Sequence, residues 1–301
     1  MSWSQATSAS SGSATLPTGF MVQQYGTGAM GDLTVLTGTA PTLSKDSYYN
    51  NVTIQGTGQL KPNGYRLFVS GTLTISSAGS INDDGVTATG AAAAAALGAR
   101  GSLGGQSGAG GAGFTNTIAN GSGGGGVTQS SLSGAATNIM PNGGAGGASF
   151  SGAQAGGAGG VATNPTGQSI WGAWDSARNT TAVVFTGGGG GGGGSCSSST
   201  LAVSGGGGSG GGAVAVYAKT VTTAGRISAN GGGGAAAVGT NNAGGGGGGA
   251  GGWVILVTDT PVSQVGTVQA NGGTGGASIG TSLPAATGTS GAVCVIGMNG
   301  T

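Results

Sequence analysis

The sequence feature that most constrains this fold is a phrase that returns at a fixed interval within glycine-rich sequence. GRISANGGGG begins at Gly225 and GTVQANGGTGG begins at Gly266, which is 41 residues later (266 − 225). A flexible linker has no reason to keep a phrase in register, whereas a repeated structural unit does. Although 77 of the 301 residues are glycine, the chain is therefore predicted to be ordered rather than a disordered tail.

The repeated unit has the pattern of two short strands joined by a turn. In residues 211–232 and again in 251–273, alternate residues are apolar before the turn, and the second strand ends in Asn-Gly. Alternation with a period of two indicates a strand, and Asn-Gly favours a turn that takes the chain out of the sheet. Alignment of the two copies predicts these lateral neighbours: Val214 with Val254, Val216 with Leu256, Val221 with Val262, Ile227 with Val268, and Asn230 with Asn271.

Weaker copies of the unit occur elsewhere in the chain. Residues 65–85 keep the alternation and place Ile81 two residues after Gly79, and the closing phrase GAVCVIGMNG resembles the first half of the unit. The first 90 residues show the same period of two, with no pattern typical of a helix. These patterns predict strands at 52–54, 67–69, 73–75, 214–217, 227–229, 254–257 and 267–269.

Uninterrupted glycine runs occupy 187–194, 205–208 and 244–249. Collagen is excluded because the chain has no Gly-X-Y period and only seven prolines. Polyglycine can instead form an extended left-handed helix, and such helices can pack side by side with hydrogen bonds between neighbouring backbones. The runs therefore predict arms that leave one strand unit and return to the next. The alanines at 91–96 fit either a short helix or packing against such a glycine layer.

Together these patterns predict an all-β fold with almost no α-helix. The expected architecture is a short-strand β-solenoid or sheet with glycine-rich arms packed as polyglycine II helices. The predicted regions are an N-terminal attachment segment at 1–35, a β-solenoid or meander at 36–90, and a glycine-rich repeat domain at 91–301 with strand rungs at 211–230, 251–271 and 291–297.

Few side chains in this sequence could carry out chemistry. The chain has no histidine, and its six acidic residues are all aspartate. Nucleophile activation and acid–base catalysis therefore lack their usual groups, so we expect no enzymatic activity and no cofactor. With seven Lys and Arg, the net charge is +1, which provides no long-range field for nucleic acid or anionic membrane. No stretch approaches the ~20 apolar residues that span a bilayer.

Two groups of residues leave alternatives open. Asn82, Asp83 and Asp84 could hold Ca²⁺ through oxygen ligands, but two carboxylates fall short of the usual ligand number, so the main interpretation is a solvated turn. Cys196 and Cys294 could form a disulfide, although isolated apolar thiols are the favoured interpretation, and their spacing is not that of a metal site.

Residues 164–185 interrupt the glycine-rich sequence and contain two of the four tryptophans. One interpretation is that Trp171 and Trp174 cover the end of the glycine stack or the sheet. The other is a protruding aromatic loop that uses these tryptophans with Asp175 and Arg178 to contact a sugar or an outer-surface protein. Aromatic side chains with polar neighbours are enriched at recognition sites, so these four residues are the candidate receptor-binding site.

The phrase GGAVAVYAKTVTTAGRISANGGGG with long glycine arms, after YYNNVTIQGTGQLKPNGYRLFVSGTLTI, resembles glycine-rich tail-fibre and receptor-binding proteins of tailed bacteriophages. It is similar, more loosely, to the fibre-tip adhesins of T-even-like phages, whose glycine motifs pack as polyglycine II. The resemblance implies a non-enzymatic virion protein whose loops, here 164–185 and 235–243, contact a host cell-surface glycan or protein. The long N-terminal β part departs from those adhesins.

The same resemblance implies partners and location. The N-terminal region would attach to other virion proteins, and the chain would be assembled in the host cytoplasm and released by lysis. The first 20 residues show neither the basic nor the apolar region of a signal peptide, which agrees with this expectation. The sequence does not determine the host, the receptor or the oligomeric state. A homo-oligomer is one of the alternatives for the oligomeric state.

The alternative function is a capsid decoration or tail spacer protein that binds no specific receptor. An antifreeze protein made of polyglycine II helices is a more distant alternative, because the irregular arm lengths argue against the flat, regular face that it needs.

Overall fold

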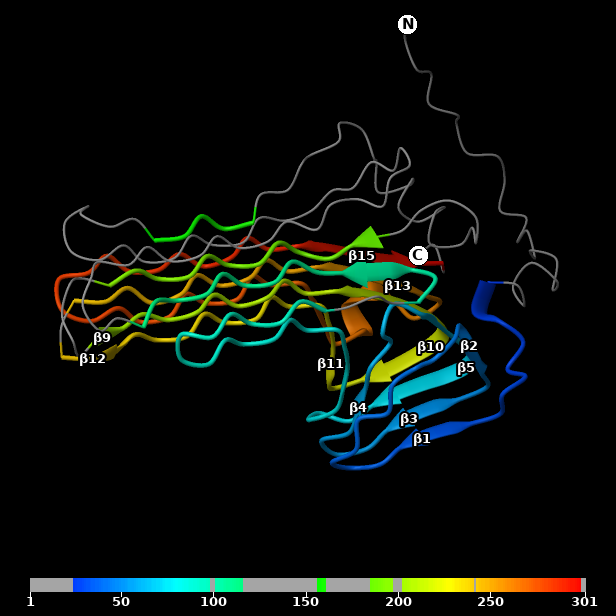
Figure 1. Ribbon diagram of the computed structural model, residues 1–301. Coiled ribbons are helices and arrows are strands. Elements are labelled where there is room, and N and C mark those ends of the chain that lie inside the picture. Colours follow the sequence, from blue (N-terminus) through cyan, green and yellow to red (C-terminus); the bar gives the residue numbers. More distant parts are fainter. Residues whose placement is uncertain are drawn as a thin grey trace, which may run out of the picture.

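The computed structural model describes residues 24–97, 101–115, 156–160, 185–196, 202–240 and 242–298. Strands are the main regular secondary structure in these ranges, where helical conformation is limited to residues 24–25 and the 3-10 helix η2 (Val262–Gln264). The main strands gather at one end of the molecule, and long extended segments project from them as a bundle (Figure 1). The prediction of a mostly β chain with almost no α-helix is confirmed.

The larger sheet has seven strands, and its strand pairs are parallel. Its order is β1-β3-β5-β10-β13-β15, and β2 also pairs with β5. The bounds are β1 (Leu33–Val35), β2 (Ser47–Tyr49), β3 (Val52–Ile54), β5 (Arg66–Ile75), β10 (Ala213–Thr223), β13 (Trp253–Thr258) and β15 (Ala292–Gly297). This sheet joins strands from both sides of residue 90, where the sequence pattern changes.

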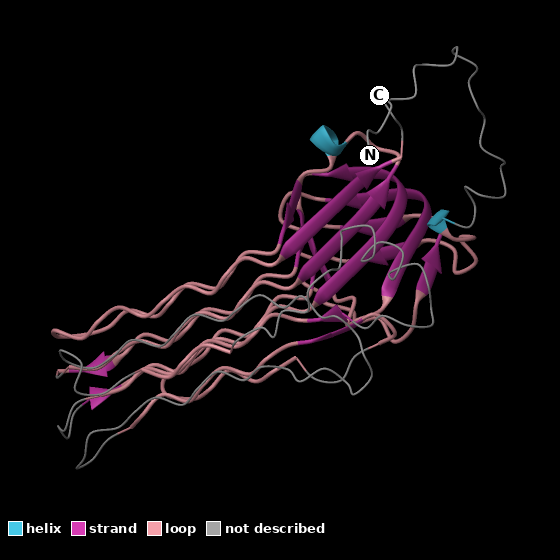
Figure 2. Ribbon diagram, turned by 90° about the horizontal axis from the view of Figure 1, so that it is seen from above, coloured by secondary structure: helices cyan, strands magenta, loops and turns pink. Residues whose placement is uncertain are grey.

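The smaller parallel sheet has the order β14-β11-β6-β4. Its strands are β4 (Gln59–Leu60), β6 (Ser80–Asn82), β11 (Arg226–Ser228) and β14 (Thr267–Gln269). Each follows a strand of the larger sheet in the chain, as β6 follows β5 and β11 follows β10. Each repeat therefore gives one strand to each sheet, and successive repeats lie side by side (Figure 2).

Two short strand pairs lie outside these sheets. β7 (Gly104–Gln106) pairs with β8 (Phe185–Thr186) in parallel, and β9 (Ala202–Val203) pairs with β12 (Val238–Gly239) in antiparallel orientation. Neither pair was predicted, because two or three residues are too few to show a hydrophobic period.

Most of the predicted lateral neighbours are confirmed by the strand register. The observed pairs are Val214 with Val254, Val216 with Leu256, Ile227 with Val268 and, through a hydrogen bond, Asn230 with Asn271. The 41-residue interval (267 − 226) is the chain length between adjacent strands of the smaller sheet, since Arg226 lies opposite Thr267.

One predicted pair is wrong. Val221 lies in β10 beside β5, whereas Val262 lies in η2 and is 51% exposed. β13 ends at Thr258, and the Thr260 hydroxyl accepts a hydrogen bond from the Val221 N–H at 2.7 Å. Pro261 follows and cannot donate a ladder hydrogen bond, so the chain leaves the sheet at this point.

The hydrophobic core lies between the two sheets. Alternate residues of the larger sheet point into it, and the middle residue of each three-residue strand of the smaller sheet points back. The fully buried members include Leu67, Leu73, Val216, Leu256, Ile81 and Ile227. Burying one such side chain contributes about 1.5–3 kcal/mol to folding, so the sheets can be stable although large apolar residues are scarce.

The opposite face of the larger sheet carries a second apolar cluster. The rings of Tyr48, Phe68 and Tyr217, from three adjacent strands, stack with centroids 4.7 and 4.8 Å apart. Tyr25 also packs in this cluster, and its hydroxyl donates a hydrogen bond to Asp259 Oδ1 at 2.6 Å. This contact ties residues 24–26 to the end of β13.

Tyr25 predicts an alkaline limit to stability. Burial, and then the hydrogen bond and charge of Asp259, raise the pKa of Tyr25 far above its ordinary value. Because the folded-state pKa is the higher one, this contribution is complete below about pH 10, the unfolded pKa, and is lost as pH rises above it. We expect the melting temperature to fall more steeply above pH 10 in the natural chain than in Tyr25→Phe. Equal slopes in thermal melts at pH 8–11 would contradict this assignment.

The glycine-rich segments are joined by backbone hydrogen bonds at every third residue. The N–H groups of Gly188, Gly191 and Gly194 donate to the carbonyls of Gly211, Gly208 and Gly205 at 2.8 Å. Those of Gly205, Gly208 and Gly211 donate to Gly244, Gly247 and Ala250, whose own N–H groups donate to Ser195, Gly192 and Gly189. Each of the three segments is thus bonded to both others. Three mutual neighbours cannot lie in one flat sheet, so the segments form a triangle.

The same arrangement continues through the later arms. The N–H groups of Gly231, Gly234 and Ala237 donate to Asn271, Thr274 and Ala277, again at every third residue. Backbone N–H groups in 246–252 donate hydrogen bonds to carbonyls in 229–235. Those in 273–276 donate to carbonyls in 246–249. The wavy traces that run side by side in Figures 1 and 2 are these segments.

Only glycine fits at many positions of this bundle. A Cβ built on Gly207 would lie 2.0 Å from Gly191 O, and one built on Gly248 would lie 1.8 Å from Gly273 O. Real Cβ atoms essentially never approach a heavy atom within 3.0 Å, so the backbones would have to separate. Glycine is needed here for close approach, and the backbone hydrogen bonds take the place of a side-chain core.

The alanine run at 91–96 is part of this bundle and not a helix. Ala94 is buried, and its N–H donates to Gly207 O at 3.1 Å. Gly110 N–H donates to Ala94 O at 3.0 Å. Of the two interpretations of this run, packing against the glycine layer is therefore the observed one, because extended segments on both sides take up its backbone groups.

Candidate functional site

The predicted receptor-binding residues Trp171, Trp174, Asp175 and Arg178 lie outside the described residues. The second predicted loop, 235–243, is described except for position 241. It lies at the end of the bundle farthest from the two sheets, where β12 pairs with β9 (Figure 1). This end of the bundle is called the far end below.

A small apolar cluster closes the far end. Cys196, Ala202, Ala237 and Ala243 are buried there, and Phe114 and Ile279 pack against them. Val238 and Leu283 are each 54% exposed. The bundle ranges 85–97, 104–115, 185–196, 202–212, 229–252 and 270–291 contain no charged residue. Any contact made by these ranges is therefore uncharged.

Both cysteines are free thiols. Cys196 is fully buried at the far end, whereas Cys294 lies in β15, where burial raises the pKa of its thiol. The two therefore do not form the disulfide that was one of the sequence alternatives. In the part of the chain that the structure describes, no three His, Cys, Asp or Glu side chains group as a metal site.

The residues Asn82, Asp83 and Asp84 take part in internal hydrogen bonds. Asp83 Oδ2 accepts from Ala213 N–H at 3.1 Å, and Asp84 pairs with Arg226 at 3.1 Å. Asn82 and Asp83 are 2% and 4% exposed, so the interpretation as a solvated turn is wrong for them. The carboxylates accept hydrogen bonds from backbone groups and a guanidinium of the neighbouring repeat.

The main polar surface lies on the side of the smaller sheet that faces away from the core. Each of its strands reads polar–apolar–polar, as in Ser-Ile-Asn, Arg-Ile-Ser and Thr-Val-Gln. Because side chains alternate along a strand, the polar ones line up across the sheet. We call this surface the polar face; it comprises Gln59, Lys61, Ser80, Asn82, Asp84, Arg226, Ser228, Asn230, Thr267, Gln269 and Asn271.

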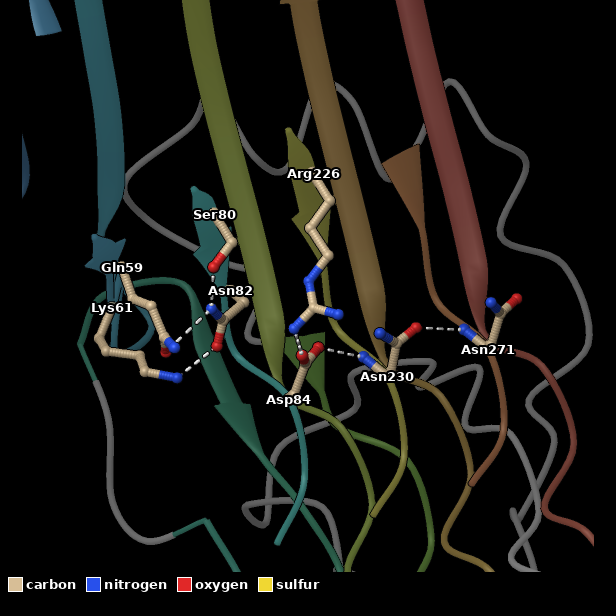
Figure 3. A network of polar contacts seen from close by, with 8 residues as sticks. All are labelled: Gln59, Lys61, Ser80, Asn82, Asp84, Arg226, Asn230 and Asn271. Atoms are coloured by element: carbon tan, nitrogen blue, oxygen red, sulfur yellow. Dashed lines mark hydrogen bonds and ion pairs between the residues drawn. The ribbon is translucent and has the colours of Figure 1, made fainter. Parts of the chain in front are cut away.

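One half of the polar face is organised around Asn82 (Figure 3). The Lys61 ammonium donates to Asn82 Oδ1. Asn82 Nδ2 donates to Ser80 Oγ at 2.6 Å and more weakly to Gln59 Oε1 at 3.4 Å. These contacts link β4 to β6 and fix the side chains at this edge of the sheet.

The other half is a ladder of side-chain oxygens that bond to the backbone of the next repeat. Asp84 Oδ1 accepts from Asn230 N–H at 2.7 Å, and Asn230 Oδ1 accepts from Asn271 N–H at 2.8 Å. Figure 3 shows these residues side by side. The Asn of the repeated phrase ANGG thus satisfies the backbone of its neighbour at the point where each strand becomes a glycine arm.

An open groove of about 490 Å³ crosses the polar face. Its lining includes Ser77, Ala78, Gly79, Ala224 and Gly225, from the turns that precede β6 and β11. The remaining lining residues come from all four strands: Gln59, Ser80, Arg226, Thr267 and Gln269. A second groove, of about 430 Å³, lies near the end of β13 and includes Gln264.

Several polar groups on or beside the first groove form no hydrogen bond with the part of the chain that the structure describes. Within the described residues, the side chains of Thr267 and Gln269 make no hydrogen bond, although both line the groove. The Ser228 hydroxyl, opposite Gln269 in the strand register, is fully buried and also without a described partner. Arg226 is fixed by Asp84 but stays 45% exposed in its side chain. The groove therefore presents polar side chains that are accessible for hydrogen bonding.

Comparisons with protein-family models, curated proteins and solved structures found no match to this chain. No helix in the described ranges has the length and apolar character needed to cross a bilayer.

The polar face as a whole was not predicted, although the sequence singled out four of its residues: Asn82, Asp84, Asn230 and Asn271. The signal that could have found the face is the polar–apolar–polar triplet at the second strand of every repeat. Its meaning depends on the parallel pairing of four such triplets, which brings residues from 59 to 269 into one surface.

Proposed function

We propose that this chain is a non-enzymatic virion structural protein, a tail-fibre or tail-tip adhesin that contacts the host cell surface through loops of its glycine-rich part. In this proposal the stacked repeats are a β-solenoid, and the glycine segments are polyglycine II helices that hold the loop at 235–243 away from the β part. The N-terminal region attaches to other virion proteins.

The hydrogen-bond period carries the proposal. A polyglycine II helix has three residues per turn and a rise of about 3.1 Å per residue. Donors at every third residue face the same neighbour in such a helix, as Gly188, Gly191 and Gly194 do. By that rise, an eight-residue segment is about 25 Å long. A bundle held by many such bonds is a stiff spacer, which is what an adhesin needs to present distant loops.

The far end is the proposed contact region. Its described turn at 235–240 carries an exposed apolar side chain, and the bundle ranges beside it are uncharged. Trp171, Trp174, Asp175 and Arg178 are a separate set of proposed receptor contacts. The segment 164–185 that carries them leads into β8 (Phe185–Thr186), which pairs with β7 near the sheets and not at the far end. Aromatic anchors commonly contribute about 2 kcal/mol or more to binding.

The alternative is a capsid decoration or tail spacer protein without a receptor. The observation that favours it is the surface of the far end, where the described side chains are uncharged. Such a surface could simply be inert.

The test is adsorption of purified protein to host cells. We expect the double variant Trp171→Ala/Trp174→Ala to lower binding at least about tenfold, from the loss of two aromatic anchors, with an unchanged melting temperature. Trp3→Ala, in the predicted attachment segment, is the matched control and should bind normally. A lowered melting temperature would assign the tryptophans to structure. If the natural chain has no affinity for host cells, that result favours the alternative function of a capsid decoration or tail spacer protein.

A further inference from the structure

We infer that the groove on the polar face binds a neutral saccharide chain that lies across the strands. The inference is independent of the loops at the far end. It rests on the proposed function only in that a virion protein meets such saccharides on a host surface.

The shape of the groove suits a flat ring. Ala78, Gly79, Ala224 and Gly225 line the groove with small residues and belong to equivalent turns of two neighbouring repeats. The groove is open and most of its lining side chains are polar, so it offers no apolar pocket for a peptide side chain. The backbone groups of the central strands β6 and β11 are used in pairing on both sides, so recognition on this face depends on side chains.

The polar groups of the lining suit vicinal hydroxyls. Gln59, Arg226 and Gln269 carry planar groups that can make two hydrogen bonds in one plane. A pair of adjacent hydroxyls on a sugar ring offers a donor and an acceptor at matching separation. Thr267 and Gln269 have no described partner, so they can bind without giving up an existing hydrogen bond.

The charge of the groove and the spacing of its strands limit the class of ligand further. Arg226 is paired with Asp84, so the groove lacks the unpaired positive charge that phosphate or nucleic acid would select. Adjacent strands lie about 4.8 Å apart, close to the length of one sugar unit along an extended chain. A saccharide laid across β4, β6, β11 and β14 would therefore present about one unit to each strand.

Affinity at one groove is expected to be weak. The groove is open and its lining contains no aromatic ring, so hydrogen bonds supply most of the binding. We expect a dissociation constant of about 1 mM for a tetrasaccharide. Many copies on one particle would raise the overall affinity.

The experiment is a titration by saturation-transfer NMR with maltotetraose, mannotetraose and chitotetraose. Thr267→Ala and Gln269→Ala lie on the edge strand β14, where both side chains are at least partly exposed, so both variants should fold. Each should weaken binding about threefold or more, and the double variant about tenfold. Gln264→Ala, at the other groove, is the matched control and should bind as the natural chain does.

Two results would overturn the inference: no binding of the three sugars at about 10 mM, or equal binding by the double variant and the natural chain. The tryptophan variants separate this inference from the proposed function. Saccharide binding that survives Trp171→Ala/Trp174→Ala but is lost in Thr267→Ala/Gln269→Ala supports the groove. If the chain binds sugar through the groove but does not bind host cells, the adhesin proposal is wrong and the inference about the groove still holds.

Discussion

Gly234→Ala is expected to destabilise the folded chain by about 3 kcal/mol or more, although it adds a single methyl group. A Cβ on Gly234 would lie 1.9 Å from Gly246 O and 2.5 Å from Gly246 C. These are backbone atoms of the adjacent segment, which is itself bonded to other segments on its far sides. The methyl group must therefore separate the two backbones and break hydrogen bonds along both. Thermal melts should show a decrease of about 6 °C or more.

Gly233→Ala is the matched control, one residue away in the same glycine run. A Cβ on Gly233 meets its nearest atoms, side-chain atoms of Thr274 and Thr87, at 3.5 Å, an ordinary contact distance. Gly233 lies outside the left-handed φ range, so alanine should restrict the unfolded chain and leave stability unchanged or raise it by about 0.4–1 kcal/mol. Equal changes in melting temperature for the two variants would show that the glycine run is not packed. That result would contradict a bundle of closely packed segments.

Ile227→Ala is expected to cost about 3 kcal/mol by leaving a cavity between the two sheets. Ile227 is fully buried and lies between Ile81 and Val268 in the register of the smaller sheet. The repeat that holds it continues directly into the arm beginning at Ala229, which is bonded to its neighbours. We therefore expect the β part and the bundle to unfold together.

Cys196 reports on that coupling because it is fully buried at the far end of the bundle. In a Cys294→Ser background, Ile227→Ala should raise the rate of Cys196 labelling by a thiol reagent about 100-fold, in proportion to the loss of global stability. Val238→Ala, an exposed change near Cys196, should leave the rate unchanged. A labelling rate that does not respond to Ile227→Ala would mean that the bundle opens independently of the β part.

The candidate site could be predicted only in part. The sequence singled out Asn230 and Asn271 as a repeated pair, and they are bonded neighbours in the structure. It did not predict that Gln59, Arg226 and Gln269 share one groove, because they come from three repeats far apart in the chain. Their proximity depends on the strand order β14-β11-β6-β4, which no local pattern encodes.

What the sequence determined by itself is local. Alternation of apolar residues placed the strands, since one face of each must be buried, and the recurring Asn-Gly placed the point at which each arm leaves. The glycine runs indicated which backbone segments can approach one another closely, because glycine has no Cβ atom. Only the tertiary structure decided which segments are neighbours. Glycine backbones offer identical hydrogen-bonding groups, so no side chain distinguishes one partner from another, and the choice depends on where the sheets position each arm.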